Sequence, residues 1–318
     1  MSPETATAAA HRAAQLENTL RKVIRGKDDV VRLALVSVFA RGHLLIEGAP
    51  GVGKTTLGQA LARALDCSFQ RVQFTSDMLP SDVLGISIYS AIEQQFEFKR
   101  GPVFTNILLA DEINRTTPKT QSALLEAMND GQVTVDVQSY PLPQPFLVIA
   151  TQNPVEHHGT YPLPESQLDR FLMRIEIGYP DPVAEKEILK RFSNSNRQAT
   201  TEAVLTPSEV LFLQDESRKI RVDESIVDYM IQIVNRTRQH PEIELGISPR
   251  GTAALFRATQ ALAMTEGRSF VIPDDVKKLV HPVFEHRLVM GHSSRGRTHA
   301  VDTKTILVEI ITQTPVPA

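Results

Sequence analysis

A glycine-rich octapeptide near the start of the chain constrains its fold more than any other feature. It reads Gly48-Ala49-Pro50-Gly51-Val52-Gly53-Lys54-Thr55 and matches the phosphate-binding pattern G-x-x-x-x-G-K-[ST] completely. A short apolar run, 43–46, precedes it, and apolar residues at helical spacing follow over 57–65. The motif therefore stands where a strand ends and a helix begins, as phosphate binding in a parallel α/β sheet requires. A chance glycine-rich turn is the alternative, and this context argues against it.

The groups of the loop have distinct roles in binding phosphate. Glycines let successive backbone N–H groups curve around phosphate oxygens, and the helix that begins near Lys54 points its positive end at them. The Lys54 ammonium supplies charge for the β- and γ-phosphates, also during catalysis, and the Thr55 hydroxyl is a ligand for Mg²⁺. We therefore expect the cofactors ATP and Mg²⁺, with ATP bound by Gly48, Ala49, Pro50, Gly51, Val52, Gly53, Lys54, Thr55 and Thr56.

Two acids follow a buried-type strand further along the chain. The run Leu108-Leu109-Ala110 leads directly into Asp111 and Glu112, and open α/β sheets place ligands at the carboxyl ends of their strands. Asp111 is predicted to bind the nucleotide and hold the Mg²⁺ shell, and Glu112 to polarise a water for in-line attack on the γ-phosphate. Two acids after a strand can also cap a helix, an alternative that the nearby phosphate loop disfavours.

A polar segment, Thr151-Gln152-Asn153, follows the next apolar run, 146–150. An amide at this point can orient the attacking water or contact the γ-phosphate, so Asn153 is a candidate for both catalysis and nucleotide binding. Asn153-Pro154 is also a plain turn signal. The role of Asn153 therefore depends on the family resemblance described below.

Two arginines occupy unusual places in the predicted pattern. Arg170 lies between a helical segment and a strand, and Arg250 lies in the first turn of a helix capped by Ser248. A cation in that first turn opposes the helix dipole, and a bound anion would explain it. A solvated arginine is the alternative reading. Arg115 and Arg174 are weaker candidates for the same kind of role.

Apolar runs alternate with helical patterns in the first half of the chain, which predicts an α/β fold with a parallel sheet and helices on both faces. Buried-type strands are expected at 43–46, 106–110, 146–150 and 171–177. Two further segments alternate apolar and polar residues and are typical of hairpins, at 86–98 and at 133–137 followed by Tyr140-Pro141. We interpret both as insertions into the core, and an extension of the main sheet is an equally open alternative.

The composition changes at 177–182, where two prolines and a glycine indicate a linker. Beyond it the pattern is helical, with a capping box at 206–209 and a helix start at Pro273. We expect an α/β nucleotide-binding core over 1–180 and a smaller all-α lid domain with a C-terminal tail over 181–318. The Ala/Thr-rich stretch 1–14 lacks the apolar core of a signal peptide and is expected to be a frayed lead into a helix.

Overall composition argues against nucleic-acid or membrane partners. The formal net charge is −3, which gives no global electrostatic case for nucleic acid or an anionic membrane. No apolar run approaches the roughly 20 residues that span a bilayer, so stable membrane insertion is not expected. The single cysteine, Cys67, excludes an internal disulfide framework and is expected to be a small buried apolar residue. A cytoplasmic location follows as our expectation.

These elements together resemble an AAA+ ATPase, and the match is closest to the MoxR family. The resemblance spans residues 14–288 and rests on the ordered combination of the segments 48–55, 108–115, 118–121, 150–154, 163–171 and 248–250. It implies that Asn153 is the sensor-1 residue and that Arg250 is sensor 2, acting in its own subunit. Arg170 resembles the arginine finger that reaches a neighbouring subunit, with Arg174 as the other candidate. The segment 23–27 resembles the one that flanks the adenine.

The resemblance also implies an assembly and a function. Proteins of this kind resemble homo-oligomers, typically ring hexamers, and the two hairpins resemble the helix-2 and pre-sensor-1 inserts of the same branch. Members resemble chaperone-like ATPases that mature or activate partner proteins, often proteins with a von Willebrand factor A (VWA) domain. A MoxR-type remodelling ATPase with a separate VWA-domain partner is the expectation.

Two alternatives remain open at this point. An ATP-driven nucleic-acid motor shares the same branch, and the near-neutral net charge counts against it. A scaffold that binds ATP without turnover is the other, and the presence of Lys54 and Glu112 counts against that.

Overall fold

A five-stranded parallel sheet forms the centre of the molecule. The computed structural model describes residues 3–135, 138–153, 160–183, 185–186, 202–291 and 302–317. The strands lie in the order β2-β5-β8-β1-β9, and all neighbouring pairs are parallel. They span β1 (Leu44–Glu47), β2 (Phe69–Gln73), β5 (Ile107–Asp111), β8 (Leu147–Gln152) and β9 (Met173–Glu176). The predicted parallel α/β fold is confirmed, and β2 is a strand that the sequence reading missed.

Successive residues of the central strands enter two separate hydrophobic clusters. In β1, Leu44 and Ile46 belong to one cluster and Leu45 to the other. The same alternation holds in β5 and β8, so both faces of these strands are buried, as their continuous apolar sequences predict. Helices cover the two faces: α1 (Pro3–Val23), α2 (Asp28–Phe39) and α3 (Lys54–Ala64) on the first, and α4 (Pro80–Leu84) and α5 (Pro118–Asp130) on the second.

The N-terminal segment is a packed helix, so the expectation of a frayed lead over 1–14 was wrong. Helix α1 begins at Pro3, and Ala9, Ala13, Leu16 and Leu20 on it are buried. These residues recur at the three- and four-residue intervals that share one helix face. The face contacts α2, α3 and α10 (Pro249–Thr265). Small alanines thus serve close helix packing, which their composition alone did not reveal.

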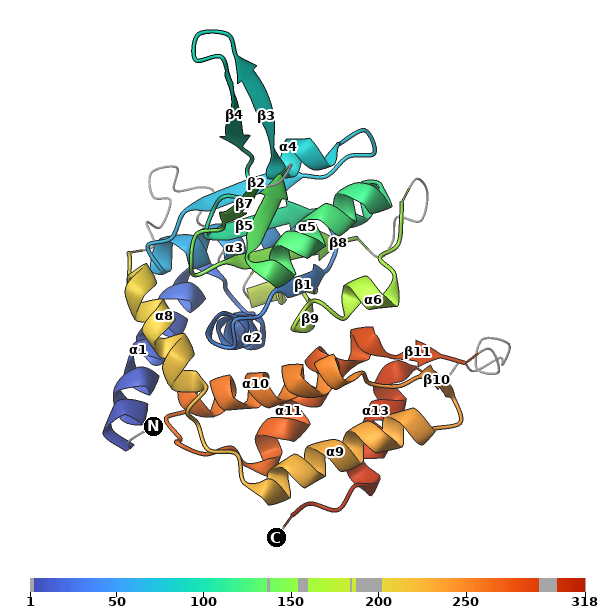
Figure 1. The fold of residues 1–318 in the computed structure, drawn as a ribbon. Coiled ribbons are helices and arrows are strands. Elements are labelled where there is room, and N and C mark those ends of the chain that lie inside the picture. The colour runs from blue at the N-terminus through green and yellow to red at the C-terminus, as the bar shows by residue number, and fades with distance from the viewer. Residues whose placement is uncertain are drawn as a thin grey trace.

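Both expected hairpins form separate two-stranded sheets instead of extending the main sheet. β3 (Gly85–Ser90) pairs with β4 (Gln95–Arg100), and β6 (Gln132–Val135) pairs with β7 (Gln138–Pro141), each antiparallel. Val137 of the second expected hairpin lies outside the described residues. Figure 1 shows β3 and β4 projecting from the body of the molecule next to α4. The reading as insertions is therefore confirmed.

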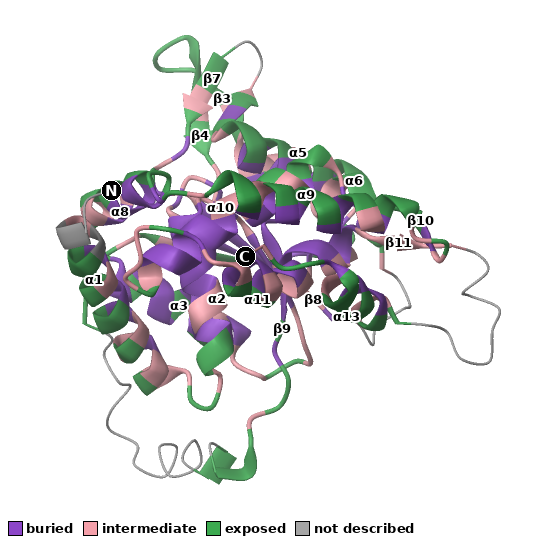
Figure 2. Cartoon of the chain, turned by 90° about the horizontal axis from the view of Figure 1, so that it is seen from below, coloured by how far each residue is buried: buried purple, intermediate pink, exposed green. Residues whose placement is uncertain are grey.

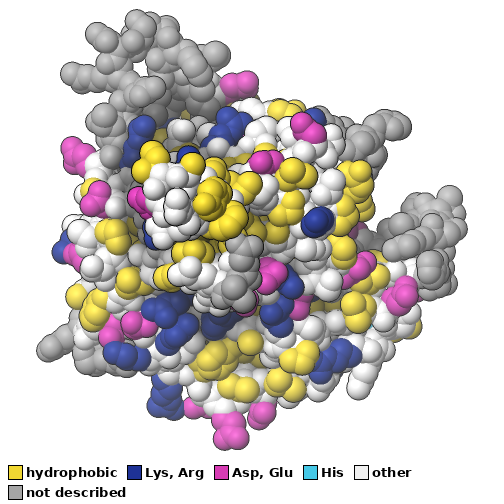
Figure 3. Space-filling model, turned by 45° about the horizontal axis from the view of Figure 1, so that its top comes forward, with side chains coloured by type: hydrophobic (Ala, Val, Ile, Leu, Met, Phe, Trp, Pro, Cys, Tyr) yellow, Lys and Arg dark blue, Asp and Glu magenta, His cyan; other side chains and the backbone are white. Residues whose placement is uncertain are grey.

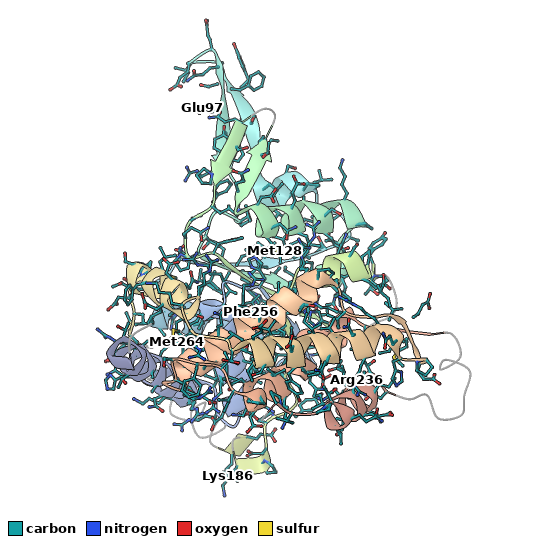
Figure 4. All side chains as sticks on the ribbon, turned by 60° about the horizontal axis from the view of Figure 1, so that its bottom comes forward. Glu97, Met128, Lys186, Arg236, Phe256 and Met264 are labelled. Atoms are coloured by element: carbon teal, nitrogen blue, oxygen red, sulfur yellow. The ribbon has the colours of Figure 1, made fainter. Side chains whose placement is uncertain are left out.

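The chain beyond the linker is mainly helical and packs beneath the sheet in Figure 1. Its apolar side chains join the cluster that α1 and α2 form with the sheet. Figure 2 shows this buried interior from below, and Figure 4 labels two residues of α10, Met264 within the cluster and Phe256, which is half-buried and packs against it. A short antiparallel pair, which the helical pattern did not predict, accompanies the helices. The elements are α8 (Pro207–Ser217), α9 (Glu224–Gln239), β10 (Ile243–Leu245), α10, α11 (Pro273–Phe284), the 3₁₀ turn η2 (Glu285–Arg287), β11 (Val289–Met290) and α13 (Thr303–Gln313).

Candidate active site

The phosphate loop joins β1 to α3, and glycine is needed at its positions for two different structural reasons. Gly51 and Gly53 have φ angles of +82° and +98°, and a Cβ at either would meet nothing within 4 Å. These glycines therefore adopt backbone that L side chains rarely adopt and face open space, where a phosphate can approach the main chain. Gly48 is constrained by packing, since a Cβ there would lie 2.4 Å from the carbonyl oxygen of Ile177.

Lys54 is the first residue of α3 and is only 9% exposed. Its Nζ donates to the carbonyl oxygen of Gly48 at 2.8 Å, so the ammonium bends back over the loop. A phosphate oxygen would be a charged and therefore stronger acceptor than this carbonyl. Thr55 and Thr56 follow in the first helical turn, whose free N–H groups point toward the same space.

Asp111 ends β5 and is buried, with both carboxylate oxygens engaged. The Thr151 hydroxyl at the end of β8 donates to Oδ1 at 2.6 Å. Arg71 on β2 donates to Oδ2 through Nη2 at 2.6 Å and Nε at 3.1 Å. The carboxylate is therefore held between the two strands that flank β5. Sequence reasoning missed Arg71 because it missed β2, and it passed over Thr151 in favour of Asn153.

Glu112 follows immediately and has the left-handed φ of +55°, which is unusual for a residue with a side chain. Its backbone N–H donates to the Thr151 hydroxyl at 2.9 Å. Its Oε2 accepts from Gln73 Nε2 at 2.7 Å and pairs with Arg115 Nε at 2.8 Å. Such strain persists only where surrounding contacts hold it, and it is common at functional sites. Gln73 is a further residue that the missed strand β2 supplies.

The strand register brings these groups to one edge of the sheet. Glu47, the residue before the phosphate loop, lies opposite Gln152, and Ala110, before Asp111, lies opposite Ala150. Asn153 follows β8, the strand between β1 and β5, and is 6% exposed. The phosphate loop, the two acids and the buried amide thus stand at the carboxyl ends of three adjacent strands.

The donor set at this edge fits a magnesium–nucleotide complex. An open backbone loop, an ammonium and a helix N-terminus are the groups that bind phosphate oxygens. The Thr55 hydroxyl and the Asp111 carboxylate are oxygen ligands of the kind that Mg²⁺ prefers. On the side of β9, the Lys27 Nζ donates to the carbonyl oxygen of Tyr179 at 2.8 Å, which joins the segment 23–27 to the chain just beyond β9.

Arg170 and Arg250 lie together at the opposite edge of the sheet. Arg170 Nη1 donates to the carbonyl oxygen of Leu125 at 2.8 Å, and Arg250 Nη2 lies 3.5 Å from Oδ1 of Asn129. Leu125 and Asn129 are one turn apart near the end of α5. The carbonyl of Met128, labelled in Figure 4, lies 3.0 Å from Nε2 of His43, just before β1. The end of α5 therefore lies at the amino ends of the strands.

In this packing Arg250 lies away from the phosphate loop of its own subunit, where the resemblance led us to expect it to act. The phosphate loop begins after the carboxyl end of β1, whereas Arg250 contacts the helix end that lies beside its amino end. Arg170 lies three residues before β9, which begins at Met173 and not at Phe171 as expected. Among the described residues, neither guanidinium forms an ion pair with a carboxylate, so both charges remain available to an outside anion.

Arg174 is engaged within its own subunit. It pairs with Glu285 of η2 at 2.7 Å and with Glu47 at 3.4 Å. Burial raises the pKa of the Glu285 carboxyl, and the Arg174 charge opposes that shift. Arg174 therefore links β9 to η2, and its charge is already matched.

Comparison with known proteins agrees with this geometry. Residues 43–173 match the model of the ATPase family associated with various cellular activities (AAA), and residues 235–310 match the AAA lid domain. The chain is 41% identical to chaperone MoxR1 of Mycobacterium tuberculosis, over 86% of this chain and 75% of that protein. It is 31% identical to protein MoxR of Methylorubrum extorquens, over 87% and 88% of the two chains.

Two further relatives cover nearly the whole chain. An uncharacterized Bacillus subtilis protein, YeaC, is 47% identical over 94% of this chain and 92% of its own length. A crystal structure of a candidate ATPase from Cytophaga hutchinsonii superimposes with a TM-score of 0.91 at 36% identity, covering 99% and 98% of the two chains.

The sheet, the phosphate loop and the helical lid define an ATP-binding and ATP-hydrolysing enzyme of the AAA+ class. Within that class the chain belongs to the MoxR family. Both the suspected family and the ATPase activity are thereby confirmed. No helix within the described ranges is long and apolar enough to cross a membrane.

Proposed function

We propose that this protein couples ATP hydrolysis to chaperone-like remodelling or activation of a partner protein, as a homo-oligomeric ring with composite active sites. The observation that carries the proposal is the distribution of charged groups over two edges of one sheet. The phosphate loop and the acids lie at the carboxyl edge, and Arg170 and Arg250 lie at the amino edge. Head-to-tail packing of identical subunits brings such edges together, and a ring closes the series. A hexamer is the proposed subunit number.

The residues of one subunit have complementary roles in this scheme. Lys54 and the loop amides hold the phosphates, and Thr55 and Asp111 would hold Mg²⁺, which neutralises charge on the phosphates when it is bound. Glu112 takes a proton from the attacking water, which Asn153 orients. Gln73, Arg115 and Thr151 restrain Glu112 and Asp111 before the nucleotide binds.

The neighbouring subunit supplies the remaining charge. Arg170 and Arg250 face its phosphate loop and stabilise the charge that develops on the γ-phosphate. An arginine supplied in this way can raise the rate about 10³-fold or more. We propose that Arg250, like Arg170, acts on the neighbouring site and not on its own.

The exposed hairpin β3–β4 is the proposed contact with the partner protein. Figure 3 shows apolar side chains gathered on the projecting part of the molecule, and the exposed members there are Ile86, Ile88, Tyr89, Ile92 and Phe96. The relative named a chaperone supports a protein as the partner. A separate VWA-domain protein in the cytoplasm is our specific proposal, and a division near residue 180 into core and lid is proposed with it.

Capture of partners on a hydrolysis-deficient variant tests this function. Glu112→Gln with ATP should retain a VWA-domain protein that the same variant releases with ADP. Glu244→Gln, an exposed substitution on β10, is the matched control and should release the partner in both conditions. Nucleic acid retained in an ATP-dependent and salt-sensitive way, with no protein, would instead support a nucleic-acid motor.

A further inference from the structure

An ion pair with a buried arginine joins the lid to the segment before β9 that carries Arg170. The Arg287 side chain in η2 is 2% exposed, and its Nε donates to Oδ1 of Asp169 at 2.8 Å. Its Nη1 donates to the carbonyl oxygens of Leu172, at 3.2 Å, and of Val283 on α11. Burial lowers the pKa of Arg287 to about 10, and the Asp169 charge opposes the shift, so the guanidinium stays charged at neutral pH.

The same carboxylate also holds the beginning of α10. The Ser248 hydroxyl lies 3.0 Å and 3.2 Å from the two oxygens of Asp169, while it accepts from the backbone N–H of Gly251 as the helix cap. A Cβ at Gly251 would lie 3.0 Å from Cδ of Arg287. The missing side chain thus allows the arginine stem to pass against the first turn of α10. Asp169 therefore connects three elements: η2, the start of α10, and the segment just before β9.

Each candidate trans-acting arginine is close in sequence to a residue of this contact. Arg170 follows Asp169 directly, and Arg250 lies two residues beyond Ser248. The two arginines belong to different parts of the chain, and they reach α5 at positions one turn apart. Their relative placement depends on how α10 is fixed to the segment before β9, and Asp169 provides that fixation through Ser248 and Arg287.

We propose that Asp169 and Arg287 are positioning residues for ATP hydrolysis in the neighbouring subunit, because they fix Arg170 and Arg250 as one unit. The inference rests on the proposed trans action of those arginines. The physical basis is that the stabilisation of a transition state depends on the exact position of the charged groups. A displacement of about 1 Å can lower the reaction rate about 100-fold. Neither residue needs to touch the nucleotide for this effect.

Asp169→Asn is the primary test, because it retains an acceptor for Ser248 and removes the charge beside Arg287. We expect ATP affinity within about twofold of the parent, a KM nearly unchanged, and a kcat lowered by about 10- to 100-fold. A native kcat would overturn the inference. So would a loss of ATP affinity comparable to the loss in kcat, since that would place the damage in the subunit's own site.

Mixed rings distinguish a positioning role of Asp169 from general damage to the subunit that carries the substitution. Asp169→Asn mixed with Lys54→Ala should regain activity, because the Lys54→Ala subunit donates intact arginines to the intact phosphate loop of the Asp169→Asn subunit. Asp169→Asn mixed with Arg170→Ala should regain none. Failure of Arg170→Ala with Lys54→Ala to recover would refute the trans scheme itself. Recovery of that pair, with no recovery of Asp169→Asn with Lys54→Ala, would refute only the positioning role.

A second variant keeps the test decisive if Asp169→Asn folds poorly. Ser248→Ala removes the link to Asp169 and one helix cap, and it should lower kcat while leaving ATP affinity unchanged. Thr206→Ala is the matched control, since Thr206 caps α8 through a hydroxyl that accepts from Glu209 N–H at 3.3 Å, away from Asp169. Equal losses of kcat in both variants, at equal losses of thermal stability, would show that capping alone matters.

Discussion

At the scale of single residues, the candidate site is defined by how firmly its acids are held before any nucleotide arrives. Thr151 joins the Asp111 carboxylate to the Glu112 backbone, and Gln73 and Arg115 bind the Glu112 carboxylate. In the proposed mechanism, Glu112 would have to exchange Gln73 or Arg115 for the attacking water.

Glu112→Gln should bind ATP with parent-like affinity and hydrolyse it at least about 100-fold more slowly, because an amide cannot take the proton from the attacking water. Equilibrium binding and phosphate release in single turnover measure the two properties separately. Glu126→Gln on the exposed side of α5 is the control and should behave as the parent. Native turnover in Glu112→Gln would remove Glu112 as the base.

Gly53→Ala should weaken ATP binding by about 5- to 30-fold, since forcing a side chain into left-handed backbone costs roughly 1–2 kcal/mol. Titration calorimetry with ATP measures the change. Gly267→Ala is a matched control, because Gly267 also has a positive φ, +77°, but lies beyond α10 away from the loop. It should lose stability without losing affinity. Equal losses of affinity in the two variants would contradict a local role for Gly53.

Cys67 should react slowly with thiol reagents. Burial, helped by the nearby Asp66 charge, raises the pKa of its thiol to about 11. The thiolate is the reactive form, so its fraction stays small at pH 8 and reaches about half only near pH 11. Alkylation of the native protein at pH 8 should be at least about 100-fold slower than that of the unfolded chain, whose thiol pKa is near 8.5. A rate that levels off below pH 9 would show that the thiol is not shielded.

At the scale of elements, the hairpin β3–β4 is anchored at its base and apolar at its end. A Cβ at Gly101 would lie 2.4 Å from the carbonyl oxygen of Val83, so the two arms begin in close backbone contact. On β4, Phe98 stacks on Tyr140 of β7 with ring centroids 4.3 Å apart. The two inserted hairpins therefore contact each other through this ring pair. Figure 4 labels Glu97 on this projecting part, apart from Met128 on α5.

Replacing residues 86–98 by a short glycine–serine linker should leave nucleotide binding unchanged and reduce activation of the partner. The reason is that the exposed apolar end lies apart from every group that faces the phosphates. Phe96→Ala, at a position 72% exposed, should show a smaller effect of the same kind. Phe212→Ala on α8, 54% exposed, should show none. Normal partner activation with impaired ATP binding would reverse the assignment.

Elements with continuous apolar sequences could be predicted, and those that depend on tertiary placement could not. β1, β5 and β8 are buried on both faces, so their sequences identify them. β2 is an outermost strand of the sheet and buries only Val72, so its sequence is not a continuous apolar run. Arg71 and Gln73 were missed with it. The helix that carries Arg250 was predicted, but its attachment to α5 is a long-range contact that local spacing does not encode.

At the scale of the whole molecule, the phosphate loop with the two acids lies at the carboxyl ends of the strands, and Arg170 and Arg250 lie at their amino ends. We propose that these are two halves of one catalytic arrangement. The lid packs beneath the sheet and brings the first turn of α10 to the amino edge, beside Arg170. The arginines of one subunit therefore cannot reach its own phosphate loop while this packing is kept. In a head-to-tail assembly, the phosphate loop of one subunit would meet the arginines of the next. Only the subunits at an open end would lack such a neighbour, and a closed ring has no open end.

Arg250→Ala should bind ATP nearly normally and hydrolyse it poorly, and mixing it with Lys54→Ala should restore activity that neither variant has alone. Restoration follows because the Lys54→Ala subunit, which lacks the charge facing the phosphates, still offers Arg250 to a neighbour with an intact loop. ATPase rates across mixing ratios, with mixed assembly confirmed by native mass spectrometry, measure it.

Arg174→Ala is the matched arginine control for this experiment. Its charge is used inside the subunit by Glu285 and Glu47, and its loss leaves a half-buried carboxylate without its partner. The Arg174→Ala substitution should therefore lower the stability of the folded protein. Mixing it with Lys54→Ala should restore no activity beyond what the Arg174→Ala subunits show alone. If Arg250→Ala gains nothing in mixed rings while Arg170→Ala does, Arg250 acts in its own subunit. The lid must then leave its packing against α5 when ATP binds, because only that movement could carry Arg250 from the amino edge of the sheet to the phosphate loop.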